Sequence, residues 1–305
     1  MMNYNIWKLS FNTGVHLGEG RLSDSGSSIS ADTLFSAFCK EILSSMGEEK
    51  LRVFVEEVKE GKLKFTDCFP YKGNSYFLPK PLLAVRFPEE NFMKNRKILK
   101  KMQYIEVKEY ASYLEGVIDL DRYEVPTFGK SELKVSNSIE KGEATPYHIG
   151  VFHFYKDSGL YFISADDNSI AFEIFMEVLE GIGLTGIGGK RSSGLGKFDI
   201  IPGNNDLLIE KLKNSTGSNF ISLTTSFPQE KEAEVLKEAK YILKRRGGFI
   251  SSEEYSESPV RKKEFYSLAA GSVFKREFEG DVFDVSRGGS HPVYRYGKPI
   301  FMEVE

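Results

Sequence analysis

Hydrophobic and polar residues change their spacing along the first two thirds of the chain, and the changes predict strands and helices in turn. Alternation with period two predicts strands, which we place at residues 4–11, 149–155, 159–164 and 197–201. Apolar residues at helical spacing predict helices, which we place at residues 31–46, 48–60, 94–115 and from 169 to about 182. The strand-helix-strand order favours a fold in which helices pack on a sheet.

The last third of the chain repeats this order in a shorter form. We expect a helix at residues 229–246, and strands at residues 219–225, 247–251, 263–268 and 292–304. Polar residues with Gly and Pro surround a short amphipathic stretch between the two parts. We therefore predict one domain at residues 1–203, a linker at 204–217 and a second domain at 218–305.

Residues 181–196 form the most distinctive segment, because glycines surround the pair Lys190-Arg191. Glycine lets the backbone take positive φ and approach a ligand closely, so N–H groups can contact phosphate oxygens while the cations add charge. A flexible linker would have polar residues between its glycines, but here Ile182, Leu184, Ile187 and Leu195 lie between them. The segment therefore predicts a polyanion-binding loop.

Two nucleotide-binding motifs fit this segment poorly. Residues 181–186 match G-x-G-x-x-G, but that fingerprint follows a strand and opens a helix, whereas this segment joins a predicted helix to a predicted strand. A Walker A loop needs Ser or Thr after its lysine, and Lys190 is followed by Arg191. A nucleotide-binding enzyme stays as an alternative that the element order disfavours.

Composition and charge restrict the possible functions of the chain but do not identify one. The chain has 305 residues, 40% of them apolar, and a formal charge of −3, which permits a local basic groove but disfavours general coating of nucleic acid. The basic clusters at residues 94–101 and 244–246 are typical of solvated helix faces. Cys39 and Cys68 lack the spaced companions of a zinc site. No apolar run has the length of a membrane span and residues 1–5 lack a signal-peptide pattern, so we expect a cytoplasmic protein without membrane contact.

A glycine-rich loop between a helix and a strand resembles the signature of the RAMP superfamily of CRISPR proteins, which bind guide RNA. Residues 4–11, 14–20, 29–38 and 291–298 resemble, within it, the type III-A (Csm) effector subunit that caps the crRNA 5′ tag, the fourth of that complex. The resemblance implies an α+β fold with two ferredoxin-like (RRM-like) domains and a thumb-like hairpin at about residues 125–156. It also implies a role in antiviral defence.

The same resemblance implies which residues contact RNA. Phosphates of the tag would meet backbone N–H groups and side chains of the loop, namely Gly186, Gly188, Gly189, Lys190, Arg191, Ser192, Ser193, Gly194 and Gly196. Ser30 and Asp32, on the first helix, would lie at the mouth of the groove, and His16 would be a further RNA-binding residue. The thumb would add Lys134, Asn137, Lys141 and Tyr147, although Glu140-Lys141 stands where an Asp-Arg pair is more typical.

Two residues raise the question of catalysis. His16 lies where some RAMP processing nucleases place a histidine that acts on the RNA 2′-hydroxyl, so a metal-independent crRNA-processing endoribonuclease is an alternative. Asp32 invites comparison with the acidic residue that a backbone subunit of these complexes uses to cleave target RNA, but helix capping explains it more simply. We expect a non-catalytic RNA-binding subunit without cofactor or metal.

The resemblance finally implies protein partners. These are the large polymerase-like Csm subunit and the first copy of the backbone RAMP subunit, with target RNA contacted only indirectly.

Overall fold

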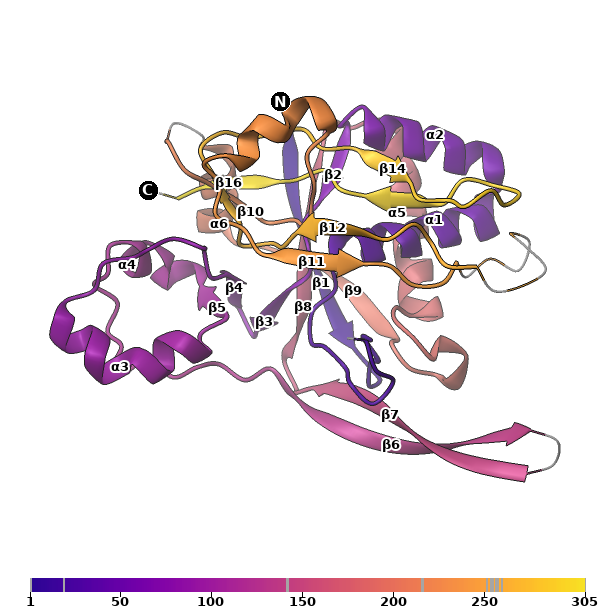
Figure 1. Ribbon diagram of the computed structural model, residues 1–305, viewed down its shortest axis with the longest axis horizontal. Coiled ribbons are helices and arrows are strands. Elements are labelled where there is room, and N and C mark those ends of the chain that lie inside the picture. The colour runs from indigo at the N-terminus through magenta and orange to yellow at the C-terminus, as the bar shows by residue number, and fades with distance from the viewer. Residues whose placement is uncertain are drawn as a thin grey trace.

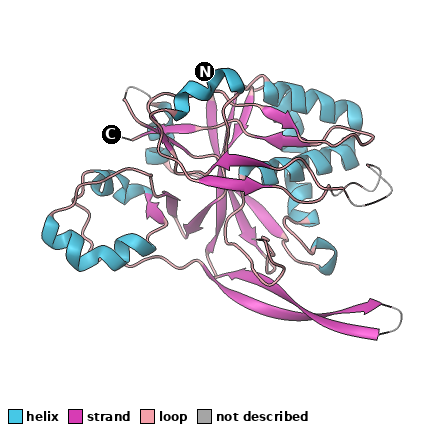
Figure 2. Ribbon diagram, viewed as in Figure 1, coloured by secondary structure: helices cyan, strands magenta, loops and turns pink. Residues whose placement is uncertain are grey.

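The computed structural model describes residues 2–18, 20–140, 143–214, 217–250, 252, 255, 258 and 260–304. Helices and antiparallel sheets occur together along the chain, which confirms the α+β class (Figure 2). No helix within these residues is long and apolar enough to cross a membrane. Among the same residues, no group of three or more His, Cys, Asp or Glu side chains could hold a metal ion.

The largest sheet is antiparallel, with the order β5-β4-β3-β8-β1-β9 and with β2 also paired to β8. Helix α1 follows β1, and α5 joins β8 to β9, so the central elements connect as β-α-β-β-α-β. The strands are β1 (Asn3–Phe11), β2 (Leu63–Phe65), β3 (Phe69–Lys72), β4 (Ser75–Pro79), β5 (Tyr104–Glu106), β8 (Ser158–Asp166) and β9 (Phe198–Gly203).

Helices α1 (Ala31–Met46), α2 (Glu48–Lys59) and α5 (Ile170–Thr185) pack together beside this sheet (Figure 1). Alternate residues of β1 and β8 face them, so Trp7 and Phe162 join Phe35, Phe38 and Phe175 in one aromatic core. The first two helices and the strand at 159–164 therefore lie where the sequence predicted them.

The opposite face of β1 and β8 is buried as well, because Ile6, Tyr161 and Ile163 pack in a second core. The C-terminal part supplies much of its cover, through Ile221, Leu223, Val273, Ile300 and Met302. This burial on both faces explains why every residue of β8 is buried.

The C-terminal part is built from short strands. One sheet has the order β13-β10-β16, and two further pairs are β11-β12 and β14-β15. The strands are β10 (Phe220–Ser222), β11 (Leu243–Arg246), β12 (Phe265–Leu268), β13 (Val273–Phe274), β14 (Val282–Asp284), β15 (Tyr294–Tyr296) and β16 (Phe301–Glu303).

Two predicted helices are wrong. The helix expected at 229–246 is a 3₁₀ segment, η3 (Glu230–Leu236), followed by a bridge of Lys240 to Val273 and by β11, because pairing with neighbouring strands overrides local helix propensity. The helix expected at 94–115 is divided into α3 (Glu89–Lys101), β5, the 3₁₀ turn η1 (Val107–Glu109) and α4 (Tyr110–Leu114). Pairing of β5 with β4 causes that division.

A short helix lies inside the predicted linker. It is α6 (Asp206–Lys213), whose Leu208 and Leu212 are buried in the second core. The Asn205 side chain caps it by accepting a hydrogen bond from the Leu208 N–H at 2.9 Å. The segment between the two parts is thus a packed element of the fold.

The predicted hairpin is present as β6 (Gly129–Glu140) and β7 (Glu143–Phe154), which pair from Gly129 with Phe154 to Glu140 with Glu143. It projects from the body along the lower edge of Figure 1. Its base contacts the segment after β1, because Val15 bridges to Phe152.

Candidate nucleic-acid interface

Residues 186–196, here called the glycine loop, join α5 to β9, as the sequence predicted. Gly196 has φ +78°, and a Cβ there would lie 2.0 Å from the Ile187 carbonyl oxygen. Gly188 has φ +93°, and its Cβ would lie 2.5 Å from the His16 carbonyl oxygen. Glycine is required at both positions because the backbone folds onto itself and onto the turn after β1.

Many N–H groups of the glycine loop already donate hydrogen bonds to backbone carbonyls of this chain. At distances of 2.8–3.0 Å, these donors are the N–H groups of Gly186, Ile187, Gly189, Ser193, Gly194 and Gly196. These six N–H groups therefore already have acceptors within the protein. Within the described chain, the N–H groups that keep no such bond belong to Gly188, Lys190, Arg191 and Ser192.

Lys190 is at the centre of the loop and has left-handed backbone dihedrals, with φ 59° and ψ 30°. Its Nζ lies 3.1 Å from the Tyr147 hydroxyl and 4.9 Å from the Tyr147 ring centroid. Tyr147 packs on Ile149, Val151 and Leu195, so β7 and the glycine loop share a small apolar core. The structure thus brings together two predicted residues that are 43 positions apart in sequence.

His16 lies beneath this junction and is 6% exposed. Its Nδ1 lies 2.7 Å from the Gly150 carbonyl oxygen, and its own carbonyl accepts the Gly189 N–H at 2.9 Å. A carbonyl can only accept, so Nδ1 must carry the hydrogen. His16 therefore connects the turn, the hairpin and the glycine loop.

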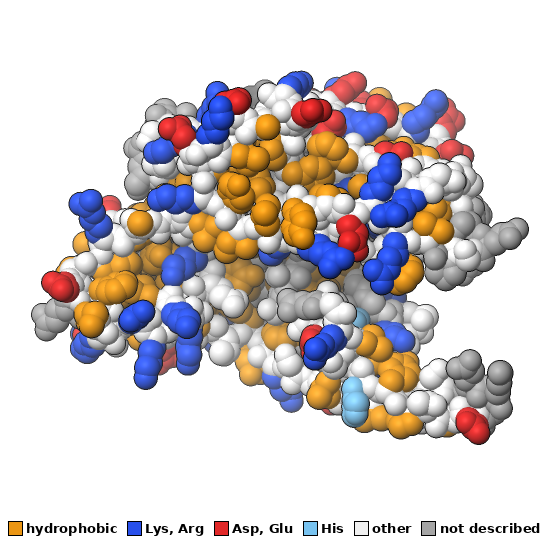
Figure 3. Space-filling view, viewed as in Figure 1, with side chains coloured by type: hydrophobic (Ala, Val, Ile, Leu, Met, Phe, Trp, Pro, Cys, Tyr) orange, Lys and Arg blue, Asp and Glu red, His pale blue; other side chains and the backbone are white. Residues whose placement is uncertain are grey.

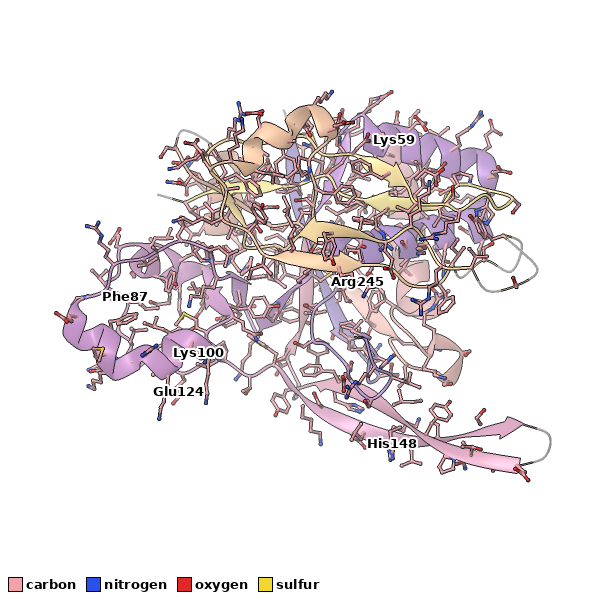
Figure 4. All side chains as sticks on the ribbon, viewed as in Figure 1. Lys59, Phe87, Lys100, Glu124, His148 and Arg245 are labelled. Atoms are coloured by element: carbon pink, nitrogen blue, oxygen red, sulfur yellow. The ribbon has the colours of Figure 1, made fainter. Side chains whose placement is uncertain are left out.

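The predicted thumb residues lie on different faces of the hairpin. Lys134 pairs with Ile149 and so shares the face of Tyr147, which meets the glycine loop. Asn137 pairs with Pro146 and lies on the opposite face, with Val135 and His148. Figure 4 labels His148 on this hairpin. Both Lys134 and Asn137 are exposed, and Lys141 lies outside the described residues.

Asp32 is not the helix cap that the sequence suggested. Its side chain is buried and forms ion pairs with Arg246 on β11 and Arg295 on β15. Ser30 occupies the cap position without a capping side-chain bond, and its hydroxyl donates to Asp32 at 2.6 Å. Burial by itself would raise the pKa of Asp32, but the charges of Arg246 and Arg295 and the hydrogen bonds hold that pKa below its usual value.

Sequence reasoning missed the residues that organise this end of α1. Asp67 accepts the Ala31 N–H at 2.8 Å and the Thr225 N–H at 2.7 Å, which connects α1 to the C-terminal part. Burial raises the pKa of Asp67 in spite of these bonds. No sequence pattern indicated Asp67. Arg246 belongs to the basic cluster at residues 244–246, which is typical of a solvated helix face. Arg295 lies inside residues 291–298, one of the segments on which the family resemblance is based.

Positive charge continues from the glycine loop to this cluster. Loss of solvation and the charge of Arg191 lower the pKa of Lys40. Burial, and then the charge of Arg295, lower the pKa of Lys262 to about 8, with Lys40 and Arg246 contributing. Lys and Arg side chains also lie on the part of the body nearest the hairpin (Figure 3). We call Arg191, Lys40 and Lys262 the basic strip, because the charge of Arg191 acts on Lys40 and the charge of Lys40 acts on Lys262.

Comparisons with known proteins agree on one family. Residues 215–304 match the model of the CRISPR Csm4 C-terminal domain. The chain is 35% identical over 306 residues to the CRISPR system Cms protein Csm4 of Mycobacterium tuberculosis H37Rv, covering 99% of this chain and 98% of that protein. It is 29% identical to the Streptococcus thermophilus protein of the same name, with both chains fully covered.

Solved structures share the fold. A Csm3-Csm4 subcomplex of the type III-A CRISPR-Cas interference complex contains a chain that matches with a TM-score of 0.70, at 20% identity and 98% coverage of both chains. A Csm1-Csm4 cassette bound to cA4 contains one that matches with a TM-score of 0.65, at 19% identity, covering 99% of this chain and 98% of the other.

Proposed function

This chain belongs to the Csm4 family of type III-A CRISPR subunits, and from that premise we propose that it binds the crRNA 5′ tag without cleaving it. The observation that carries the proposal is the contact of Lys190 with Tyr147, which joins the glycine loop to the hairpin. One surface thereby offers a cation, an aromatic ring and backbone donors, which are the groups that hold single-stranded RNA.

In this proposal the side chains of Lys190, Arg191, Ser192 and Ser193 contact phosphates. The N–H groups of Gly188 and of residues 190–192 add donors, while the other glycines shape the loop. Lys134 extends the contact along the hairpin, on the same face as Tyr147. Ser30 and Asp32 act indirectly, because Asp32 orients Arg246 and Arg295.

We also propose that the chain has no catalytic role. His16 is buried and holds Gly150 through Nδ1, which supports positioning of the loop over proton transfer to RNA. The Asp32 carboxylate is occupied by two guanidinium groups, so it is poorly placed to act on a scissile phosphate.

The proposed partners are those seen with proteins of similar fold. The solved complexes that contain them pair Csm4 with Csm3 and with Csm1. We propose that this chain likewise contacts the backbone RAMP subunit and the large polymerase-like subunit, and reaches target RNA only through them.

The test measures binding of labelled crRNA by wild type and by the double variant Lys190→Ala, Arg191→Ala. We expect the variant to bind at least about tenfold more weakly, because charge-assisted hydrogen bonds are lost. The slope of log affinity against log salt should also fall by about 1.4, for two phosphates of a single strand. The matched control is the double variant Lys231→Ala, Lys237→Ala. Lys231 lies on η3 and Lys237 directly follows it, and η3 is drawn orange at the top of Figure 1, away from the hairpin.

A gel of the same binding reactions shows whether the labelled crRNA stays intact. Equal affinity for RNA with and without the tag, or an unaffected double variant, would contradict the proposal. Shortened RNA that is absent with His16→Ala would instead establish the endoribonuclease.

A further inference from the structure

A cavity of about 560 Å³ lies on the C-terminal part, between η3, β12 and β14. Three phenylalanine rings contribute to its lining, since the Phe227 ring centroid lies 4.7 Å from that of Phe265 and 4.1 Å from that of Phe283. Further apolar side chains in the lining are Leu236, Leu268 and Val285. A lining of this kind is typical of a pocket that binds an apolar group.

Exposed apolar residues lie around the cavity. Tyr241, Leu243 and Tyr266 also line it, and they are 39%, 53% and 62% exposed. Figure 3 shows hydrophobic side chains gathered on this face of the body, above the hairpin. Adjacent apolar groups in contact with water are unfavourable, and such a patch commonly marks the contact site of another molecule.

The edge of β12 beside the cavity has an unused backbone position at Tyr266. Leu268 exchanges two backbone hydrogen bonds with Ser226, at 2.7 Å and 3.0 Å, on the side of β12 that faces away from β11. Backbone groups alternate along a strand, so the N–H and C=O of Tyr266 point to the same side as those of Leu268. The chain turns away after Ser226, because the Phe227 N–H donates to the Gly297 carbonyl at 3.3 Å, and no described residue forms a backbone hydrogen bond with Tyr266 on this side. An extended polypeptide can fill this position by strand addition.

Charge disfavours RNA as the occupant of this cavity. The charged residues in its lining are Glu230, Lys263, Glu264 and Asp284. Arg245 pairs with Glu264 at 2.6 Å, so the surroundings hold no excess of positive charge for a phosphate. A polypeptide can instead place an apolar side chain in the cavity while its backbone pairs with Tyr266.

We propose that an extended segment of the large polymerase-like subunit adds to β12 at Tyr266 and places an apolar side chain in this cavity. The inference rests on the proposed function, which gives the chain two protein partners. The backbone RAMP subunit shares the bound RNA, so it approaches the side of the glycine loop and the hairpin. The cavity lies between η3 and β12, above β11 in Figure 1, whereas the hairpin lies below, which leaves this surface to the large subunit.

The first experiment measures the affinity of the full chain for the purified large subunit. The double variant Leu243→Ser, Tyr266→Ser should bind it at least about tenfold more weakly than wild type, as truncation of an aromatic anchor in an interface predicts. The matched control is Met93→Ser, Val117→Ser, at residues that are 68% and 66% exposed and do not line the cavity. This control should stay within about twofold of wild type.

Hydrogen exchange then tests strand addition directly. The Tyr266 N–H should exchange at least about tenfold more slowly in the complex than in the free chain, because a carbonyl of the added segment accepts it. The internal reference is the Lys240 N–H, which already donates to the Val273 carbonyl at 2.8 Å and should keep its exchange rate.

Measuring tagged crRNA binding on the same proteins separates this surface from the RNA function. A double variant that loses the large subunit but binds crRNA like wild type supports the assignment. Unchanged affinity for the large subunit, unchanged exchange at Tyr266, or loss of the backbone subunit instead overturns it while RNA binding stands. If wild type binds the large subunit but not crRNA, the RNA-binding proposal fails, and the variant and the exchange rate still decide the surface. If wild type does not bind the large subunit, the assignment is wrong.

Discussion

Asp32 shows how one side chain can stabilise the contact between the two ends of the sequence. Its carboxylate is buried on α1 and pairs with arginines from β11 and β15. A buried charge that loses its partner is more costly than a surface pair, because little water reaches it. The sequence could suggest a cap at this position, but it could not show which cations would arrive from residues more than 200 positions away.

Asp32→Asn should destabilise the protein by about 3–5 kcal/mol at pH 7, because both arginines lose their counter-charge. The folded state lowers the pKa of Asp32, so its contribution is complete above the ordinary value and decreases as pH falls below it. Urea unfolding at pH 7 and pH 3 should therefore show a smaller acid-induced loss in the variant than in wild type.

Glu234→Gln is the control for this change, since Glu234 forms an exposed pair with Lys237 and its loss should cost about 0–1 kcal/mol. Equal acid-induced losses in wild type and Asp32→Asn would show that the two arginines do not stabilise the carboxylate.

At the scale of elements, the glycine loop is held by close backbone contacts. Gly194 and Gly196 have similar positive φ, but only Gly196 faces a carbonyl: its Cβ would lie 2.0 Å from the Ile187 oxygen, whereas nothing lies within 4 Å of a Cβ at Gly194. Gly194→Ala should cost roughly 1–2 kcal/mol, the strain of a left-handed residue. Gly196→Ala should cost clearly more, because the backbone must also move.

Urea unfolding of the two alanine variants measures this difference directly. Similar losses in both would mean that the loop can move away from Ile187, and that its shape depends on dihedral freedom alone.

The sequence predicted the elements whose periodicity is local. Helices α1, α2 and α5, strand β1 and the helix-loop-strand order of the glycine loop follow from spacing, whereas the hairpin was implied by the family resemblance. The helices predicted at residues 229–246 and 94–115 are wrong. In the first segment β11 pairs with β12, and in the second β5 pairs with β4 and interrupts the helical pattern. For the site, Lys190 and Tyr147 were predicted and do meet, but Arg246, Arg295 and Asp67 depend on tertiary contacts that no local pattern encodes.

At the scale of the whole molecule, the two parts share their cores. Tyr296 and Val282 pack with the aromatic core of α1, α2 and α5, and the second core combines Ile6 and Ile163 with Met302. The division into one domain at residues 1–203 and a second at 218–305 stays a prediction. For folding, such shared cores favour one cooperative unit, because exposing either part removes apolar cover from the other.

We therefore expect a single unfolding transition. Trp7, the only tryptophan, reports unfolding of the main sheet by fluorescence. Its urea midpoint should coincide with the midpoint measured by far-ultraviolet circular dichroism.

Tyr296→Ala should shift both midpoints equally and lower the free energy of unfolding by about 3–5 kcal/mol. The reason is that the Tyr296 ring packs on Phe35 and Phe65, and its hydroxyl accepts the Phe65 N–H at 2.8 Å. Tyr266→Ala, at a side chain that is 62% exposed, should change stability by at most about 0.5 kcal/mol. Two separate transitions, with only one moved by Tyr296→Ala, would instead show that each part folds alone and that the basic strip forms only when the parts dock.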